Sequence, residues 1–282
     1  MNDNVKTGFR CIEFDGGVNI DAVAQFIEDG ELDGSRLIVI RDCHSQENCR
    51  LLRDKFYEII DRQGSDRPDD GFVKNHQIGS SQFHKACSEY MLETFAAAPS
   101  VMELFGVLPP DAIRNLFLDE SLEAAFAERR IVYGPARHGA FHGNFATTRR
   151  WLNNGRMALH PHDDAAQLAF AAEDGFEIAK GSHTIAANVC LAEDDVEGGN
   201  LVVWNHCPTN EERARLGLEK TGYPYPIEYV AKFDRLDVKI RTGDIHFLNA
   251  SYIHGVENST TNSHITAGRF ITQFKNKVVY WT

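Results

Sequence analysis

The second half of the chain is a succession of short strand-like segments, and this pattern limits the fold more than any other. From Ile131 onward, apolar and β-branched stretches alternate with Gly, Pro, Asn and Asp. The stretches are RMALHPHDD, HTIAANVCLA, GGNLVVWN, YVAKF, LDVKIRTGDIHFLN and TAGRFITQFKNKVVYWT. Many short strands with turn residues between them are typical of an antiparallel sandwich or barrel. We therefore expect such a core over about residues 131–282.

The first part of the chain reads mainly as helices. Apolar residues recur at three-and-four spacing in several segments, and Ser45 is a plausible N-cap for one of them. Helices are expected over residues 21–29, 46–60 and much of 88–130, with breaks at Pro99 and Pro109, and short strands over 10–14 and 36–40. These helices should brace the sheet. We expect one α+β domain over residues 1–282, with a helix-rich flank over about 1–130.

Composition and charge narrow the function. The chain has 282 residues, 43% of them hydrophobic, and a formal net charge of −12. Nucleic acids and anionic membranes would be repelled by such a surface, so a small-molecule substrate is expected. No apolar run approaches the roughly 20 residues that cross a bilayer, and the N-terminus does not resemble a signal peptide, which favours the cytoplasm. The sequence does not indicate the oligomeric state.

The six cysteines do not form a recognisable metal or disulfide pattern. They are scattered, without a C-x-x-C pair. We expect reduced thiols, with Cys190 in the core because it lies within the apolar stretch TIAANVCLA.

The segment MALHPHDDAAQ contains the strongest candidate for a metal site. Residues two apart on a strand face the same side, so His162 and Asp164 should point together while Asp163 points away. The later segment RTGDIHFLNASYIHGVEN offers His246 and His254, and a strand, a turn and a second strand would bring His254 back to the sheet. Two histidines and one carboxylate form the facial triad of non-haem Fe(II) oxygenases.

A co-substrate such as 2-oxoglutarate would need a buried cation for its distal carboxylate. Arg269 lies 15 residues beyond His254 (269 − 254 = 15) on the next expected strand, and Thr266 nearby offers a hydroxyl. A guanidinium suits a carboxylate because it forms two parallel hydrogen bonds.

These motifs together resemble the Fe(II)/2-oxoglutarate-dependent oxygenases. The segments EGGNLVVW, KNKVVYWT and RLIVIRD are similar to those of one branch, the freestanding aliphatic halogenases of indole-alkaloid biosynthesis and the related N-acyl amino acid hydroxylases. The resemblance implies a double-stranded β-helix (jelly-roll or cupin-like) core braced by N-terminal and central helices. It also implies Fe(II) on His162, Asp164 and His254, 2-oxoglutarate paired with Arg269, and O₂ as oxidant.

Residue 164 separates two outcomes within this branch. The halogenases have glycine in place of the carboxylate, which frees a coordination site for chloride, whereas this chain has Asp164. The resemblance therefore implies hydroxylation of an unactivated C–H bond in a small metabolite, such as an amino acid derivative, with release of succinate and CO₂.

Other functions stay open at this stage. One is halogenation or another oxidative outcome on the same scaffold, and another is a non-catalytic barrel that binds a small molecule. A cupin-type metalloenzyme would use His160 with His162, and His254 to Asn258 fits its second motif. The glutamate of its first motif is missing, because Ala165, Ala166 and Gln167 follow the aspartates.

Several neighbouring residues have ordinary structural interpretations as well as functional ones. His160 and His246 are expected to pack or hydrogen-bond near the site rather than to bind metal, and Asp163 to be solvated or to cap a turn. His206 could contact substrate or lie on a loop. One of Arg149, Arg150 and Arg156 could pair with an acidic substrate group, although such arginines usually lie at the surface. The helices over 45–130 and the insertion 205–226 are expected to form pocket walls or a lid.

Overall fold

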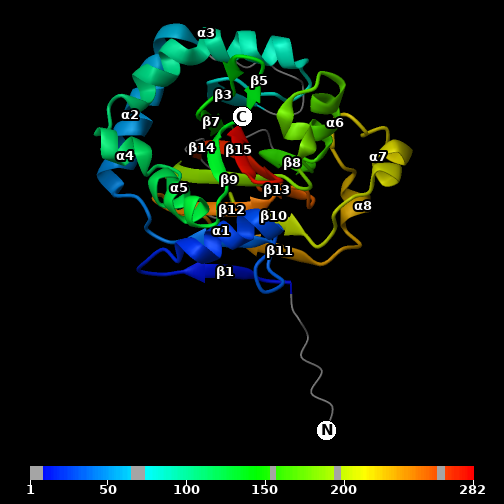
Figure 1. Cartoon of the computed structure of the whole chain (residues 1–282). Helices are drawn as coiled ribbons and strands as arrows, with labels where there is room; N and C mark the ends of the chain where they lie inside the picture. The colour runs from blue at the N-terminus through cyan, green and yellow to red at the C-terminus, as the bar shows by residue number, and fades with distance from the viewer. Residues whose placement is uncertain (1–8, 65–73, 153–156, 194–197, 259–263) are drawn as a thin grey trace.

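Two sheets enclose the central pocket of this protein, and helices cover the outer face of the larger sheet (Figure 1). The computed structural model describes residues 9–64, 74–152, 157–193, 198–258 and 264–282.

The larger sheet has nine strands, in the order β1-β2-β12-β9-β14-β15-β4, with β7 paired to β14 and β3 paired to β7. Their bounds are β1 Cys11–Phe14, β2 Leu37–Ile40, β3 Asn75–Ile78, β4 Val132–Pro135, β7 Thr147–Trp151, β9 Ile185–Ala192, β12 Ile245–Asn249, β14 Ile265–Phe274 and β15 Lys277–Trp281. The central strand β9 is apolar almost throughout because both of its faces are covered. Ile185, Val189 and Leu191 face the main hydrophobic core, whereas Ala186 and Asn188 line the pocket.

The smaller sheet has four antiparallel strands in the order β11-β10-β13-β8. They are β8 Leu159–His162, β10 Leu201–Trp204, β11 Arg235–Val238 and β13 His254–Val256. From β7 to β14 the chain alternates between the sheets: β7, β9, β12 and β14 belong to the larger sheet, and β8, β10, β11 and β13 to the smaller one. A two-stranded hairpin, β5 Arg137–His138 with β6 Phe141–His142, stands apart.

The helices arch around the larger sheet in Figure 1. They are α1 Ile20–Asp29, α2 Gln46–Gln63, α3 Cys87–Phe105, α4 Pro110–Arg114 and α5 Asp119–Glu128. In α2 the Ser45 side chain accepts a hydrogen bond from the Asn48 amide, as expected of an N-cap, and Leu52, Phe56 and Ile59 are buried. Burying a side chain such as Phe56 contributes roughly 1.5–3 kcal/mol.

The remaining helical segments follow β8 in the chain. They are α6 Ala166–Glu173, the 3₁₀ turn Glu177–Lys180, α7 Asn210–Leu216 and α8 Ile227–Val230. The helix α7 lies within the insertion 205–226.

Two expectations about local structure were wrong. Pro99 does not break α3 but lies inside it, where its missing N–H leaves only the carbonyl of Phe95 without a helical partner. The segment YVAKF does not form a strand. Its first two residues, Tyr229 and Val230, end the helix α8 and pack with Phe233 and Tyr225 in a small cluster. Strand β3 lies in a segment for which no element was predicted, and β7 lies within the expected strand-rich region 131–282 although its own segment was not singled out.

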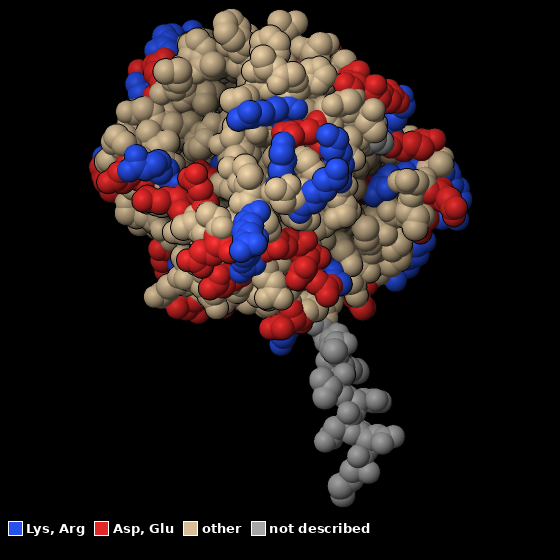
Figure 2. All heavy atoms as spheres, viewed as in Figure 1, with Lys and Arg blue, Asp and Glu red and all other residues tan. Residues whose placement is uncertain are grey.

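On the face shown in Figure 2, acidic and basic side chains are interspersed. Of the helices that the structure describes, none combines the length and the apolar composition needed to span a membrane. All six cysteines are free thiols, and Cys190 is fully buried as expected.

Candidate active site and metal centre

Three buried side chains meet at the end of the smaller sheet. His162 is the last residue of β8, His254 is the first residue of β13, and the two are paired directly in the antiparallel ladder. Asp164 follows two residues after His162. Single ligand atoms of His162, Asp164 and His254 all lie within 4.8 Å of one another. The structure thus brings together the three residues that the sequence predicted as ligands.

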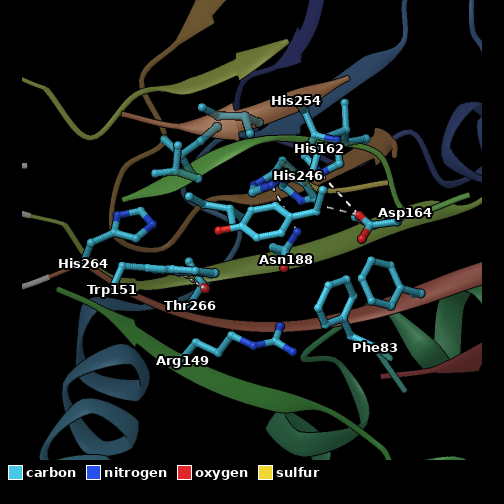
Figure 3. Close-up of a pocket in the computed structure, with 18 of the residues that line it drawn as sticks. Phe83, Arg149, Trp151, His162, Asp164, Asn188, His246, His254, His264 and Thr266 are labelled. Carbon is cyan, nitrogen blue, oxygen red and sulfur yellow. Dashed lines mark hydrogen bonds and ion pairs between the residues drawn. The ribbon is translucent and has the colours of Figure 1, made fainter. Parts of the chain in front are cut away.

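Both imidazoles are oriented in the same way. His162 Nδ1 lies 2.9 Å from the carbonyl of His160, and His254 Nδ1 lies 2.9 Å from the carbonyl of Tyr252. Because a carbonyl can only accept, each Nδ1 carries the proton and each Nε2 keeps its lone pair. The two Nε2 atoms lie 3.9 Å and 3.3 Å from Asp164 Oδ2 (Figure 3).

Burial and neighbouring groups fix the charge state of this cluster. Burial, together with the nearby His254, lowers the pKa of His162 to about 4, so the ring is neutral at pH 7. Burial would raise the pKa of the Asp164 carboxyl, but the adjacent His254 and His162 side chains outweigh it, and the pKa is lowered. Neutral imidazoles and one carboxylate are the donor set that suits Fe(II), so these residues fit that ion.

The pocket has a polar side away from Asp164. In Figure 3, Trp151, Thr266 and His264 lie opposite Asp164, and the Arg149 guanidinium points into the pocket. Trp151 Nε1 donates to the Thr266 hydroxyl at 3.2 Å. Arg149 is paired with Thr266 across β7 and β14, and its Nε donates to Gln77 Oε1 at 3.0 Å. It is the only arginine among the described residues that line the pocket.

Apolar and aromatic side chains form the wall nearest the three ligands. They are Phe83, Ala186, Tyr223, Leu248 and Phe270. The Tyr223 ring meets the His162 ring edge-on at 6.2 Å and the Phe83 ring edge-on at 6.2 Å.

Arg269 does not line the pocket, and its predicted role is wrong. Side chains alternate along β14, so Thr266 and Phe270 face the pocket whereas Arg269 faces the helices. There the guanidinium lies over the rings of Phe117 and Tyr280 and forms an ion pair with Asp119. It is only 2% exposed. The buried guanidinium therefore pairs with a partly exposed carboxylate and stabilises the core.

Two other expectations near the motif also need correction or refinement. Asp163 is not solvated: it is 1% exposed, and its carboxylate accepts hydrogen bonds from Arg213. Arg149 is a pocket residue, whereas the guanidinium of Arg150 lies 4.9 Å from the ring centre of Tyr57. Arg156 lies outside the described residues.

The remaining histidines are not part of the ligand cluster. His246 lines the pocket from β12, where Asn188 Nδ2 lies 3.3 Å from its Nε2. His206 lies outside the pocket lining, stacked on Phe233 at 3.9 Å and hydrogen-bonded to Tyr229. His160 contributes its backbone carbonyl to His162.

Comparison with known proteins decides the family. No protein-family model matches the chain. The chain is 42% identical over 284 aligned positions to the L-isoleucine 3(1)-dioxygenase of Pantoea ananatis (strain AJ13355), covering all of this chain and 96% of that protein. The chain belongs to the Fe(II)/2-oxoglutarate-dependent oxygenase family. It is a dioxygenase of this family, with iron and 2-oxoglutarate as its cofactor and co-substrate.

Solved structures of the same general fold support the architecture. The N-substituted L-amino acid dioxygenase of Burkholderia ambifaria AMMD is 15% identical, with a TM-score of 0.52, and covers 93% of this chain and 91% of its own. Its complex with α-ketoglutarate gives a TM-score of 0.53 over the same coverage. At this identity the likeness describes the fold, a mixed α+β arrangement with large sheets.

Proposed function

We propose that this dioxygenase hydroxylates an unactivated C–H bond of an aliphatic L-amino acid. The observation that carries the proposal is the buried cluster of His162, Asp164 and His254 at the edge of a pocket with one apolar wall and one arginine. The amino acid class is taken from the relative that is 42% identical, whose name gives L-isoleucine as its substrate.

The strand order supports a jelly-roll core within a single oxygenase domain. Strands β7 to β14 alternate between the two facing sheets, except that β10 and β11, joined by residues 205–234, are antiparallel neighbours in the smaller one. A double-stranded β-helix has this alternation, and its interior between the sheets is where the cluster lies.

Each side of the pocket has a role in this proposal. His162, Asp164 and His254 would hold Fe(II) through two nitrogens and one oxygen. Iron with 2-oxoglutarate supplies the oxidising chemistry: O₂ places one atom in succinate and the other in the substrate, and CO₂ is released. Arg149, with the Thr266 hydroxyl beside it, would bind the distal carboxylate of 2-oxoglutarate.

The apolar wall would select and position the substrate. Phe83, Tyr223 and Phe270 offer only ring surfaces and one hydroxyl near the ligands, which suits a branched aliphatic side chain. Contact with these side chains keeps the reacting carbon close to the metal ligands and excludes water from it.

Asp164 favours hydroxylation over halogenation. Its carboxylate is directed at both histidine Nε2 atoms, so the position that a halide would need is taken by a protein ligand. We therefore assign the enzyme to the hydroxylating members of its group.

Two measurements test the proposal. Under anaerobic conditions, adding Fe(II) and 2-oxoglutarate should produce a weak visible charge-transfer band that Asp164→Ala removes. In air, incubation with L-isoleucine and other aliphatic L-amino acids should yield a product heavier by one oxygen together with one succinate. A band without any hydroxylated amino acid would refute the substrate class while leaving the cofactor assignment intact.

A further inference from the structure

Asp163 attaches the segment after α7 to the strand that carries the metal ligands. Its side chain is on the opposite side of the chain from His162 and Asp164 and is 0% exposed. Arg213 Nε donates to its Oδ2 at 3.0 Å and Arg213 Nη2 to its Oδ1 at 2.9 Å. The Tyr225 hydroxyl adds a bond of 2.7 Å and the Ala165 amide one of 3.0 Å. Four donors fully satisfy this buried carboxylate.

Main-chain hydrogen bonds hold the same two segments together. The Asp163 amide donates to the Gly222 carbonyl at 2.9 Å, and the Tyr225 amide donates to the Pro161 carbonyl at 2.8 Å. Gly222 has φ +59°, and a Cβ there would lie 2.3 Å from the Asp163 carbonyl oxygen. This close approach requires glycine.

Tyr223 lies between these two attachment points. Its ring lines the pocket and contacts His162 and Phe83 edge-on. Asp163, which lies between His162 and Asp164 in the sequence, therefore also determines the position of Tyr223 in the pocket wall. Arg213 reaches Asp163 from the buried side of α7, where Asn210 Oδ1 accepts a bond of 2.9 Å from its Nη1.

We propose that Asp163 and Arg213 are positioning residues. Their ion pair holds Tyr223, and with it this part of the pocket wall, at a fixed position relative to the metal ligands. The inference rests on the proposed function. In the coupled reaction, 2-oxoglutarate, O₂ and the amino acid give succinate, CO₂ and the hydroxylated amino acid. If Tyr223 is displaced, the substrate C–H bond is no longer held close enough to the metal site to react. The second oxygen atom is then reduced to water by two electrons and two protons from ascorbate, which becomes dehydroascorbate.

The test compares Arg213→Lys with Arg215→Lys in the full-length, iron-loaded enzyme. Lysine keeps the charge but cannot form the two-pronged bond, whereas Arg215 lies exposed on the same helix and serves as the matched control. With Fe(II), 2-oxoglutarate, ascorbate and L-isoleucine, the ratio of hydroxylated product to succinate should fall about tenfold in Arg213→Lys, the scale of loss expected from a small misplacement of substrate. The ratio should not change in Arg215→Lys.

A second measurement is independent of the substrate. In the metal-free protein, hydrogen exchange of the Asp163 and Tyr225 amides should accelerate in Arg213→Lys and stay unchanged in Arg215→Lys. Unchanged exchange, or a total activity that falls while the product-to-succinate ratio holds, would overturn the positioning role. If the parent enzyme releases no succinate with L-isoleucine, the proposed substrate fails, and the exchange comparison alone then decides. Should Arg213→Lys not fold, Tyr225→Phe removes one donor to Asp163 and should give a smaller change in the same direction.

Discussion

Gln167 Nε2 donates a 2.7 Å hydrogen bond to Oδ1 of Asp164, which leaves Oδ2 directed at the two histidines. Gln167 is 4% exposed and lies one helical turn after the carboxylate that it orients. We expect Gln167→Leu to weaken Fe(II) binding about 10- to 100-fold, the usual effect of removing a hydrogen bond to a metal ligand. Titration of the apoprotein with Fe(II) in the presence of 2-oxoglutarate measures this. In Gln167→Glu the side chain keeps an acceptor but loses the donor. If either variant binds Fe(II) as tightly as the parent, Gln167 does not orient Asp164 for metal binding.

Arg149 should control the affinity for 2-oxoglutarate. In Arg149→Lys the ammonium cannot bind a carboxylate with two parallel bonds, so KM for 2-oxoglutarate should rise about tenfold or more. KM for the amino acid should change little. If KM rises for the amino acid alone, Arg149 binds the substrate carboxylate instead.

Arg269 should matter for stability and not for co-substrate binding. Replacing it by Met leaves the partly exposed carboxylate of Asp119 without its ionic partner, so we expect a loss of about 3 kcal/mol, the low end of the cost of breaking a buried pair. Urea unfolding measures this loss. The double variant Asp119→Leu with Arg269→Met should recover part of the lost stability, and KM for 2-oxoglutarate in the folded fraction should match the parent. A raised KM would restore the role first predicted for Arg269.

The metal-free protein should lose stability as the pH falls below about 6.5. Burial lowers the pKa of His44 to about 4 and that of His246 to about 3, below the value of 6.5 for an exposed histidine. Between these values the unfolded chain binds protons that the folded chain does not, so the stability is complete above 6.5 and is lost toward pH 4. His44→Gln should reduce the slope of the free energy of unfolding against pH by about 1.4 kcal/mol per pH unit in this window. Urea unfolding at several pH values measures the slope, and an unchanged slope would show that His44 is protonated in the folded protein.

Asp164→Gly should abolish hydroxylation. The variant removes the only carboxylate of the described ligand cluster and opens one coordination position. Mass spectrometry of the products with and without chloride measures the outcome, and Asp163→Gly is not a suitable control because it breaks the Arg213 ion pair. Normal hydroxylation by Asp164→Gly would mean that Asp164 is not a ligand.

The ligand cluster could be predicted from the sequence because each part has a local signal. The two-residue spacing of His162 and Asp164 predicts side chains on one side of the chain, and this holds although β8 ends at His162 and Asp164 follows it. A turn before His254 brings that residue into the strand beside His162. Most strands from β8 onward could be predicted in the same way, since turn residues separate them.

The anchor for the co-substrate could not be predicted because it depends on which face of β14 each residue occupies. Arg269 and Phe270 are neighbours in the sequence but face opposite sides, and the sequence of the strand does not state which side is the pocket. Arg149 lies on β7, a strand whose polar sequence TTRRW has no apolar alternation to reveal it. Asp163 caps the turn through the Ala165 amide, one of the two roles expected for it, but its burial could not be predicted because its partner Arg213 is 50 residues away.

Because His254 pairs directly with His162 in the ladder, tight binding of iron depends on the correct alignment of β13 with β8. If β13 were displaced by one residue along β8, the His254 side chain would turn to the outer surface, and the ligand cluster would retain only the nitrogen of His162 and the carboxylate of Asp164. Only chains whose small sheet has assembled in the correct alignment can therefore retain the ion tightly, so loading with metal during biosynthesis would distinguish mature enzyme from mispaired chains.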